Sequence, residues 1–267
     1  MFETSKRYEF AQDVCRAAGE LALSYFKGTA TLRVEQKGPQ DWVSEADKEV
    51  ETFLRARIEA SWPSDGIYGE EHENKSGESG FDWVIDPIDG TTNFVNGIPA
   101  WTVVLAGVSE AQTETGVIHD PNASETFSAR RGFGATLNGQ KLRVASDVEM
   151  ASGSVAVGYS NRVPAQNILP VLKDVVNSGA MFHRNASGAL SLAYVAAGRL
   201  LGYVEEHMNA WDCLAGQLLI QEAGGCIEEQ DADEMIRNGG RVVAGTPDVF
   251  PKLQVICDKA WSSRTSR

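Results

Sequence analysis

The pattern of apolar and polar positions predicts helices at the start of the chain. Apolar residues recur at helical spacing through residues 8–26 and again through residues 47–58, and Pro63 follows the second run and ends it. The stretch between them, residues 37–47, is polar and contains a Gly-Pro pair, so it is interpreted as a loop.

From residue 81 the pattern changes to that of strands. Residues 102–108 form a near-continuous apolar run, which is typical of a strand covered on both faces. Asn138-Gly139 is a hairpin signal. Shorter strands are predicted at residues 66–68, 82–86, 116–118, 125–129 and 142–144.

A second cycle of strands and helices begins near residue 154, and the change of pattern near residue 147 predicts a boundary between two lobes, residues 1–147 and 148–267. In this half we expect a strand near residue 154, helices at 166–176 and 188–197, a strand at 201–205, a helix at 210–223, a strand at 241–244 and a helix ending near residue 257.

Composition narrows the possible functions. The net charge of −13 argues against a nucleic-acid partner, which requires a basic face. It fits either general solubility or acidic residues gathered to hold cations. No apolar run approaches the ~20 residues of a membrane helix, and the charged N-terminus does not resemble a signal peptide. Four cysteines without CxxC spacing are typical of reduced thiols in a cytoplasmic protein.

The candidate chemistry begins where a predicted strand ends on Asp86 and Asp89 follows three residues later. Two carboxylates this close repel each other unless a cation lies between them, and hard oxygen ligands suit Mg²⁺. Pro87 is expected to prevent further sheet pairing. Gly90 and Thr91 come next, and a helical turn starting there would offer free N–H groups to an anion. The alternative is an aspartate helix cap followed by a turn.

Two other acidic positions could serve the same site. Glu70 follows a predicted short strand, although a Glu-Glu pair is also common on surfaces. Asp212 lies in the first turn of a predicted helix, where capping is its simplest role. Cys213 is interpreted as helix packing, because no basic residue adjoins it. Spacing alone does not show that these residues converge in space.

Taken in order, these segments resemble the signature motifs of the inositol monophosphatase family. The strings are Gly69-Glu70-Glu71, Asp86-Pro-Ile-Asp-Gly-Thr-Thr-Asn-Phe94, Trp211-Asp212-x-x-Ala-Gly216 followed by Glu222-Ala-Gly-Gly225, and Asp41-x-Val-Ser-x-x-Asp47, in which Ser44 stands where the family usually has Thr. The resemblance covers about residues 8–255. It implies a layered α-β-α-β-α sandwich, an α+β or α/β fold.

The resemblance also implies roles for individual residues. A first Mg²⁺ would be held by Glu70, Asp86 and the Ile88 carbonyl, a second by Asp86, Asp89 and Asp212, and a weaker third through waters near Glu70. Substrate contacts would come from Asp89, Gly90, Thr91, Gly188, Glu205 and Asp212. Glu70 and Thr91 would orient the attacking water, supported by Asp41 and Asp47, with Lys37 on a loop that can reach the site.

By resemblance, the expected reaction is Mg²⁺-dependent hydrolysis of the phosphate monoester of a small polyol, first of all inositol monophosphate. A lithium-sensitive, homodimeric, cytoplasmic enzyme is implied. Alternatives are fructose 1,6-bisphosphate, histidinol phosphate or a phosphoadenosine nucleotide as substrate, or a noncatalytic, RNA-linked regulatory protein. The chain departs from the usual pattern at Ala186-Ser187, where Gly-Ser is common, and at Gly188-Ala-Leu-Ser191, where Ala-Ala-Leu-Asp is common.

Overall fold

Two β-sheets organise the chain. The computed structural model describes residues 2–28, 34–38 and 41–261, and it describes side chains within residues 5–28, 34–35 and 44–261. A seven-stranded sheet has the order β3-β4-β5-β6-β7-β8-β9, and a five-stranded sheet has the order β11-β10-β12-β14-β13. The strands of the first are β3 Gly66–Gly69, β4 Phe81–Asp89, β5 Thr102–Ser109, β6 Gln112–Asp120, β7 Glu125–Arg130, β8 Gly134–Leu137 and β9 Gln140–Lys141. Those of the second are β10 Ser154–Val157, β11 Met181–His183, β12 Gly202–Met208, β13 Cys226–Ile227 and β14 Gly240–Gly245.

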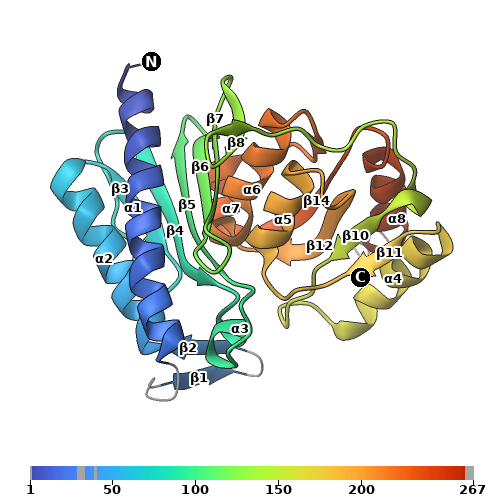
Figure 1. Cartoon of the computed structure of the whole chain (residues 1–267), viewed down its shortest axis with the longest axis horizontal. Coiled ribbons are helices and arrows are strands. Elements are labelled where there is room, and N and C mark those ends of the chain that lie inside the picture. The colour runs from blue at the N-terminus through green and yellow to red at the C-terminus, as the bar shows by residue number, and fades with distance from the viewer. Residues whose placement is uncertain (1, 29–33, 39–40, 262–267) are drawn as a thin grey trace.

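Helices cover both sheets and separate them. Figure 1 shows the layers in sequence: α1 and α2, the larger sheet, then α5, α6 and α7, the smaller sheet, and finally α4 and α8. The layered α-β-α-β-α sandwich is therefore confirmed. The helices are α1 Phe2–Lys27, α2 Glu45–Ser61, α3 Thr91–Val95, α4 Ile168–Asn177, α5 Gly188–Ala196, α6 Ala210–Glu222, α7 Ala232–Asn238 and α8 Phe250–Trp261. The division into lobes at residue 147 stays a prediction.

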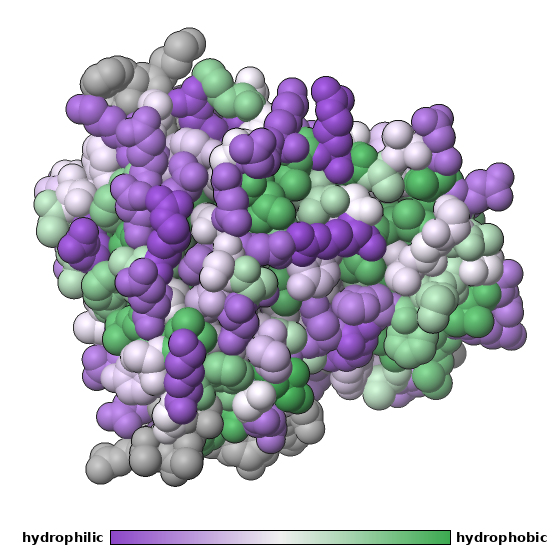
Figure 2. Space-filling model, viewed as in Figure 1, coloured by the Kyte–Doolittle hydropathy of each residue, from purple (hydrophilic) through white to green (hydrophobic). Residues whose placement is uncertain are grey.

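The surface over the first helix layer is mostly polar. Figure 2 shows that hydrophilic residues predominate over α1, on the outer face of the first layer. Within the described part of the chain, no helix combines the length and the apolar character that crossing a membrane would require.

Most predicted elements are confirmed with shifted ends, but two predictions are wrong. The polar stretch interpreted as a loop instead forms an antiparallel hairpin of β1 (Val34–Gly38) and β2 (Asp41–Ser44). Backbone hydrogen bonds alone form such a ladder, so a polar sequence does not exclude it. The strand expected at 142–144 is also absent, because pairing ends at Lys141. The amide of Val144 donates instead to the carbonyl oxygen of Ala223, 3.1 Å away.

The end of β4 corrects a third expectation. Pro87 was expected to stop sheet pairing, yet β4 continues to Asp89, which pairs with Thr102 on β5. The register shifts between Asp86 and Asp89, so the proline lies in an irregular segment where no ladder hydrogen bond is required. The irregular segment is thus bounded by Asp86 and Asp89, the two aspartates of the candidate metal site.

Helix α6 is buried between the two sheets. Its side chains from Cys213 to Ile220 are all buried, which is typical of a helix enclosed on every side. It approaches β6 closely because Gly116 has no side chain: a Cβ there would lie 2.8 Å from the Cα of Ala215. The first turn of this helix therefore has a fixed position relative to the larger sheet.

Candidate functional site

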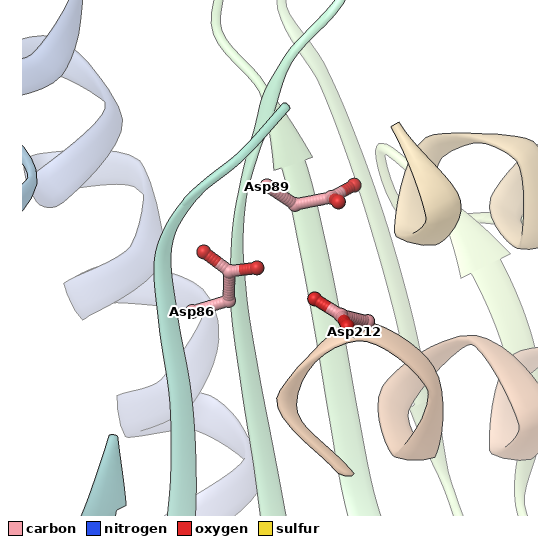
Figure 3. Close-up of side chains that lie close together, drawn as sticks. All are labelled: Asp86, Asp89 and Asp212. Carbon is pink, nitrogen blue, oxygen red and sulfur yellow. The ribbon is translucent and has the colours of Figure 1, made fainter. Parts of the chain in front are cut away.

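Three aspartates from distant parts of the chain meet between the sheets. Asp86 and Asp89 come from the end of β4, and Asp212 comes from the first turn of α6. Each offers a carboxylate oxygen, and these oxygens all lie within 4.8 Å of one another. Figure 3 shows the three side chains lying close together, with Asp212 on a helix facing the strand segment that carries Asp86 and Asp89. The convergence that the sequence could not show is present for these three residues.

Local hydrogen bonds hold two of these carboxylates. The amide of Ile88 donates to Oδ1 of Asp86 at 3.0 Å. Asp212 belongs to a capping box in which its Oδ2 accepts the amide of Asn209 at 3.3 Å. The capping role considered for Asp212 is therefore real, and it orients the same carboxylate that joins the cluster.

The side-chain carboxylate of Asp89 lies against the N-terminus of α5. Its Oδ2 accepts the hydroxyl of Ser187 and, at 2.9 Å, the amide of Ala189, and its Oδ1 accepts the amide of Gly188 at 3.2 Å. The helix dipole favours a negative charge here. Ala186 adopts a φ of 60° immediately before this turn, a left-handed conformation that favours glycine, the residue that the family pattern led us to expect here. The amide of Gly188 contacts Asp89, and its contact with substrate stays a prediction.

Burial and mutual repulsion raise the pKa values of the cluster. The pKa of Asp86 is raised chiefly by burial and then by the charges of Glu70, Asp89 and Asp212. Burial raises the pKa of Asp89 to about 7, with the charge of Asp212 adding to it. A divalent cation would remove this repulsion, and the donor set consists of carboxylate oxygens, the ligands that Mg²⁺ prefers. The residues present therefore fit a magnesium site. Glu70, just after β3, is close enough to act electrostatically on Asp86.

A second group of residues adjoins the cluster. Asp47 caps α2: its Oδ2 accepts the amide and the hydroxyl of Ser44 at 2.8 and 2.6 Å. Its Oδ1 accepts the hydroxyl of Thr91 at 3.0 Å, and Thr91 also lies 3.1 Å from the Ile88 carbonyl oxygen. Burial raises the pKa of Asp47 to about 6. The side chains of Lys37 and Asp41 lie outside the described residues, so their predicted roles stay predictions.

Gly90 shapes the turn between the cluster and Thr91. Its φ is 98°, a left-handed conformation that favours glycine, and a Cβ would lie 2.9 Å from the Ala100 carbonyl oxygen. It precedes α3, whose first amides have no partner within the helix.

A cavity of about 130 Å³ opens beside the cluster, and Asp89, Asp212 and Glu205 all line it. Glu205, on β12, accepts the hydroxyl of Tyr203 at 2.5 Å, and burial raises its pKa to about 7. Sequence reasoning missed Tyr203, although it lies two positions before Glu205 on the same strand and hence on the same face. Arg162 and Arg184, which also line the cavity, were missed as well.

The cysteines take no part in this site. All four are free, and Cys213, Cys15 and Cys257 are buried. Burial raises the pKa of the Cys213 thiol well above its usual value, so the thiolate is not formed and the packing interpretation agrees with the structure.

Comparison with known proteins agrees with this geometry. The model of the inositol monophosphatase family matches residues 3–264. The chain belongs to this family. It is 37% identical over 250 residues to the inositol-1-monophosphatase of Mesorhizobium japonicum, a match that covers 92% of this chain and 94% of that protein. It is 36% identical over 241 residues to the Nus factor SuhB of Escherichia coli strain K12, with 89% and 90% covered.

Solved structures of family members share the fold. The extragenic suppressor protein suhB of Bartonella henselae superposes with a TM-score of 0.88 at 32% identity, covering 94% of this chain and 98% of that one. The Thermotoga maritima IMPase gives a TM-score of 0.85 at 27% identity, covering 96% and 98%. Family membership, which the motifs indicated, is therefore confirmed.

Proposed function

We propose that this protein hydrolyses the phosphate monoester of a small polyol in a Mg²⁺-dependent reaction, with inositol monophosphate as the first candidate substrate. The observation that supports it most is the group of three carboxylates within 4.8 Å of one another, next to the Thr91–Asp47 hydrogen bond. This arrangement combines a cation site with a proton acceptor. Family membership adds support, since one of its relatives is named an inositol-1-monophosphatase.

Asp86, Asp89 and Asp212 would hold Mg²⁺, with Glu70 and the Ile88 carbonyl as further ligands and a weaker third ion near Glu70. When bound, Mg²⁺ lowers the pKa of water and neutralises charge on the phosphoryl oxygens. Hydrolysis breaks the bond between phosphorus and the alcohol oxygen. The oxygen of the water remains on the phosphate, and a proton ends on the alcohol.

The remaining residues position the reactants. Because its proton is donated to Asp47, the Thr91 hydroxyl has a lone pair available to accept a hydrogen bond from the attacking water. Asp47, when ionised, is the acceptor to which the proton passes through Thr91. The free amides of Gly90 and Thr91 would bind the phosphate. On the other side, Glu205 would accept a hydroxyl of the leaving alcohol, and Tyr203 holds that carboxylate in place.

A regulatory role is the second candidate, because another relative is named a Nus factor. The Asp86→Asn variant distinguishes the enzymatic role from the regulatory role. As an enzyme, the variant should lose at least ~1000-fold in phosphate release from inositol 1-phosphate with Mg²⁺, because one of its three central ligands loses its charge. Asp82→Asn, at the other end of β4, is the matched control and should stay active. Full activity in Asp86→Asn would refute the enzymatic proposal. Biological activity that survives without hydrolysis would favour the regulatory one.

We also propose the other properties that family membership implies. They are inhibition by Li⁺, a homodimer, a cytoplasmic location, and an alcohol drawn from polyols or sugars rather than nucleic acid. Phosphate release in millimolar Li⁺ tests the first, and the mass of the protein in solution tests the second.

A further inference from the structure

Two arginines line the same cavity as the carboxylates. Arg162 follows β10 and Arg184 follows β11, and these two strands are parallel neighbours. The carboxyl ends of parallel neighbours lie at the same sheet edge, so the two loops approach the cavity together. Nη2 of Arg184 donates to the carbonyl oxygen of Tyr159 at 3.1 Å, which ties the two loops to each other.

Neither of these guanidinium groups forms an ion pair with another described residue. Seven arginines of the described chain pair with a carboxylate, as expected where acidic residues outnumber basic ones. Two others, Arg57 and Arg130, lie over aromatic rings. Among the described residues, Arg143, Arg162 and Arg184 have neither kind of partner, and of these three only Arg162 and Arg184 line the cavity with the acidic groups.

Both arginines act electrostatically on the leaving-group side of the site. Burial raises the pKa values of Glu205 and Asp212, and the positive charge of Arg162 opposes both increases. The charge of Arg184 also opposes the increase for Glu205. Glu205, which lines the same cavity, already accepts the hydroxyl of Tyr203. A further polar atom, Nε2 of His183, is buried beside them without a hydrogen-bond partner in the described chain. Apart from the bond from Arg184 to Tyr159, the guanidinium N–H groups at this wall have no acceptor among the described residues.

We propose that Arg162 and Arg184 form a subsite for a second anionic group on the substrate. The preferred substrate is then a phosphate monoester whose alcohol carries another phosphate or a carboxylate, in addition to a hydroxyl that Glu205 binds. This inference rests on the proposed function and narrows its substrate class. Guanidinium groups bind phosphate and carboxylate through paired N–H donors, and two of them discriminate strongly against an uncharged group at the same position.

Matched substrate pairs test the subsite. Fructose 1,6-bisphosphate against fructose 1-phosphate adds a phosphate, and 2-phosphoglycerate against glycerol 2-phosphate adds a carboxylate. In the unaltered protein with Mg²⁺ we expect kcat/KM to be at least ~10-fold higher for the doubly anionic member of one or both pairs, as for one charge-assisted hydrogen bond. The pair that shows the preference identifies the second anion.

Variants assign the preference to the arginines. Arg162→Gln and Arg184→Gln should each lower the ratio of kcat/KM within the preferred pair toward 1 and leave the singly anionic substrate nearly unchanged. Arg143→Gln is the control, because Arg143 is also exposed, has no ion pair in the described chain, and is not among the residues that line the cavity. A ratio near 1 in the unaltered protein, or equal losses on both members of a pair, would overturn the subsite.

Measurements of substrate binding distinguish a wrong subsite from a wrong proposed function. If neither pair nor inositol 1-phosphate is hydrolysed, the proposed hydrolysis is wrong, and calorimetric affinities for fructose 1,6-bisphosphate and fructose 1-phosphate still test the arginines. Tighter binding of the bisphosphate that is lost in Arg162→Gln and Arg184→Gln supports the subsite, and equal affinities refute it.

Discussion

Replacing Gly116 with alanine should disturb the metal site from a distance. The new Cβ would lie 2.8 Å from the Cα of Ala215 and 2.9 Å from its carbonyl oxygen. Both are backbone atoms of α6, so no side-chain rotation relieves the contact. Ordinary contact begins at 3.4 Å, so α6 and β6 must separate by about 0.6 Å, the difference between 3.4 and 2.8. Asp212 lies one turn before Ala215 and moves with the helix.

The expected cost follows from that displacement. Overpacking of this kind lowers the free energy of unfolding by about 1–3 kcal/mol. A shift of the Asp212 carboxylate by half an ångström should also weaken Mg²⁺ binding and lower kcat/KM by about 10-fold or more, since misplacements near 1 Å cost about 100-fold. Urea denaturation measures the first effect. Mg²⁺-dependent phosphate release measures the second.

A matched variant makes the test specific. In Gly153→Ala the three atoms nearest to the new Cβ all belong to the side chain of Leu201, the closest at 3.0 Å, so this change should be tolerated better. Wild-type stability and wild-type kcat/KM in Gly116→Ala would show that α6 is not held at this distance, and the link between the glycine and the site would be wrong.

Two further predictions concern pH. Burial raises the pKa of Asp47 to about 6, so kcat should fall as the pH drops through about 6. Bound Mg²⁺ would lower this pKa and shift the fall in kcat to a somewhat lower pH. Asp47→Asn should lose about 100-fold in kcat and should no longer show this acid limb of the pH profile. Burial lowers the pKa of His119 to about 4, below its usual 6.5. The unfolded chain therefore takes up this proton first as the pH falls, and urea denaturation should show an unfolding free energy smaller by about 2 kcal/mol at pH 5 than at pH 7 from this group. His119→Gln should lack that part of the decrease, and an identical pH dependence in both proteins would contradict it.

The metal side of the site was largely predictable from the sequence. Asp86 and Asp89 are close in the chain, so local geometry determines their proximity. The position of Asp212 could not be predicted in this way, because it depends on α6 crossing the larger sheet at Gly116. That contact between residues far apart in sequence follows from packing, and only the resemblance to a family supplied it in advance.

The substrate side was predicted less well. Glu205 came from the resemblance, and its partner Tyr203 follows from strand periodicity once the strand is assigned. The proximity of Arg162 and Arg184 depends on β10 and β11 ending at the same sheet edge. Strand β11 has three residues, none of them buried, and this leaves little hydrophobic pattern to detect. Without that strand, nothing in the sequence brings the two arginines together.

The two sheets would contribute different parts of the proposed reaction. The aspartates are fixed by β4 and by α6, which packs on the larger sheet, whereas the loops around the leaving alcohol follow strands of the smaller sheet. Such loops tolerate substitution far better than a buried helix. In the proposed enzyme, natural selection can therefore alter the accepted alcohol through residues 158–162 and 184–186 while the group of three aspartates is inherited intact, and paralogues with new preferences need no new catalytic chemistry.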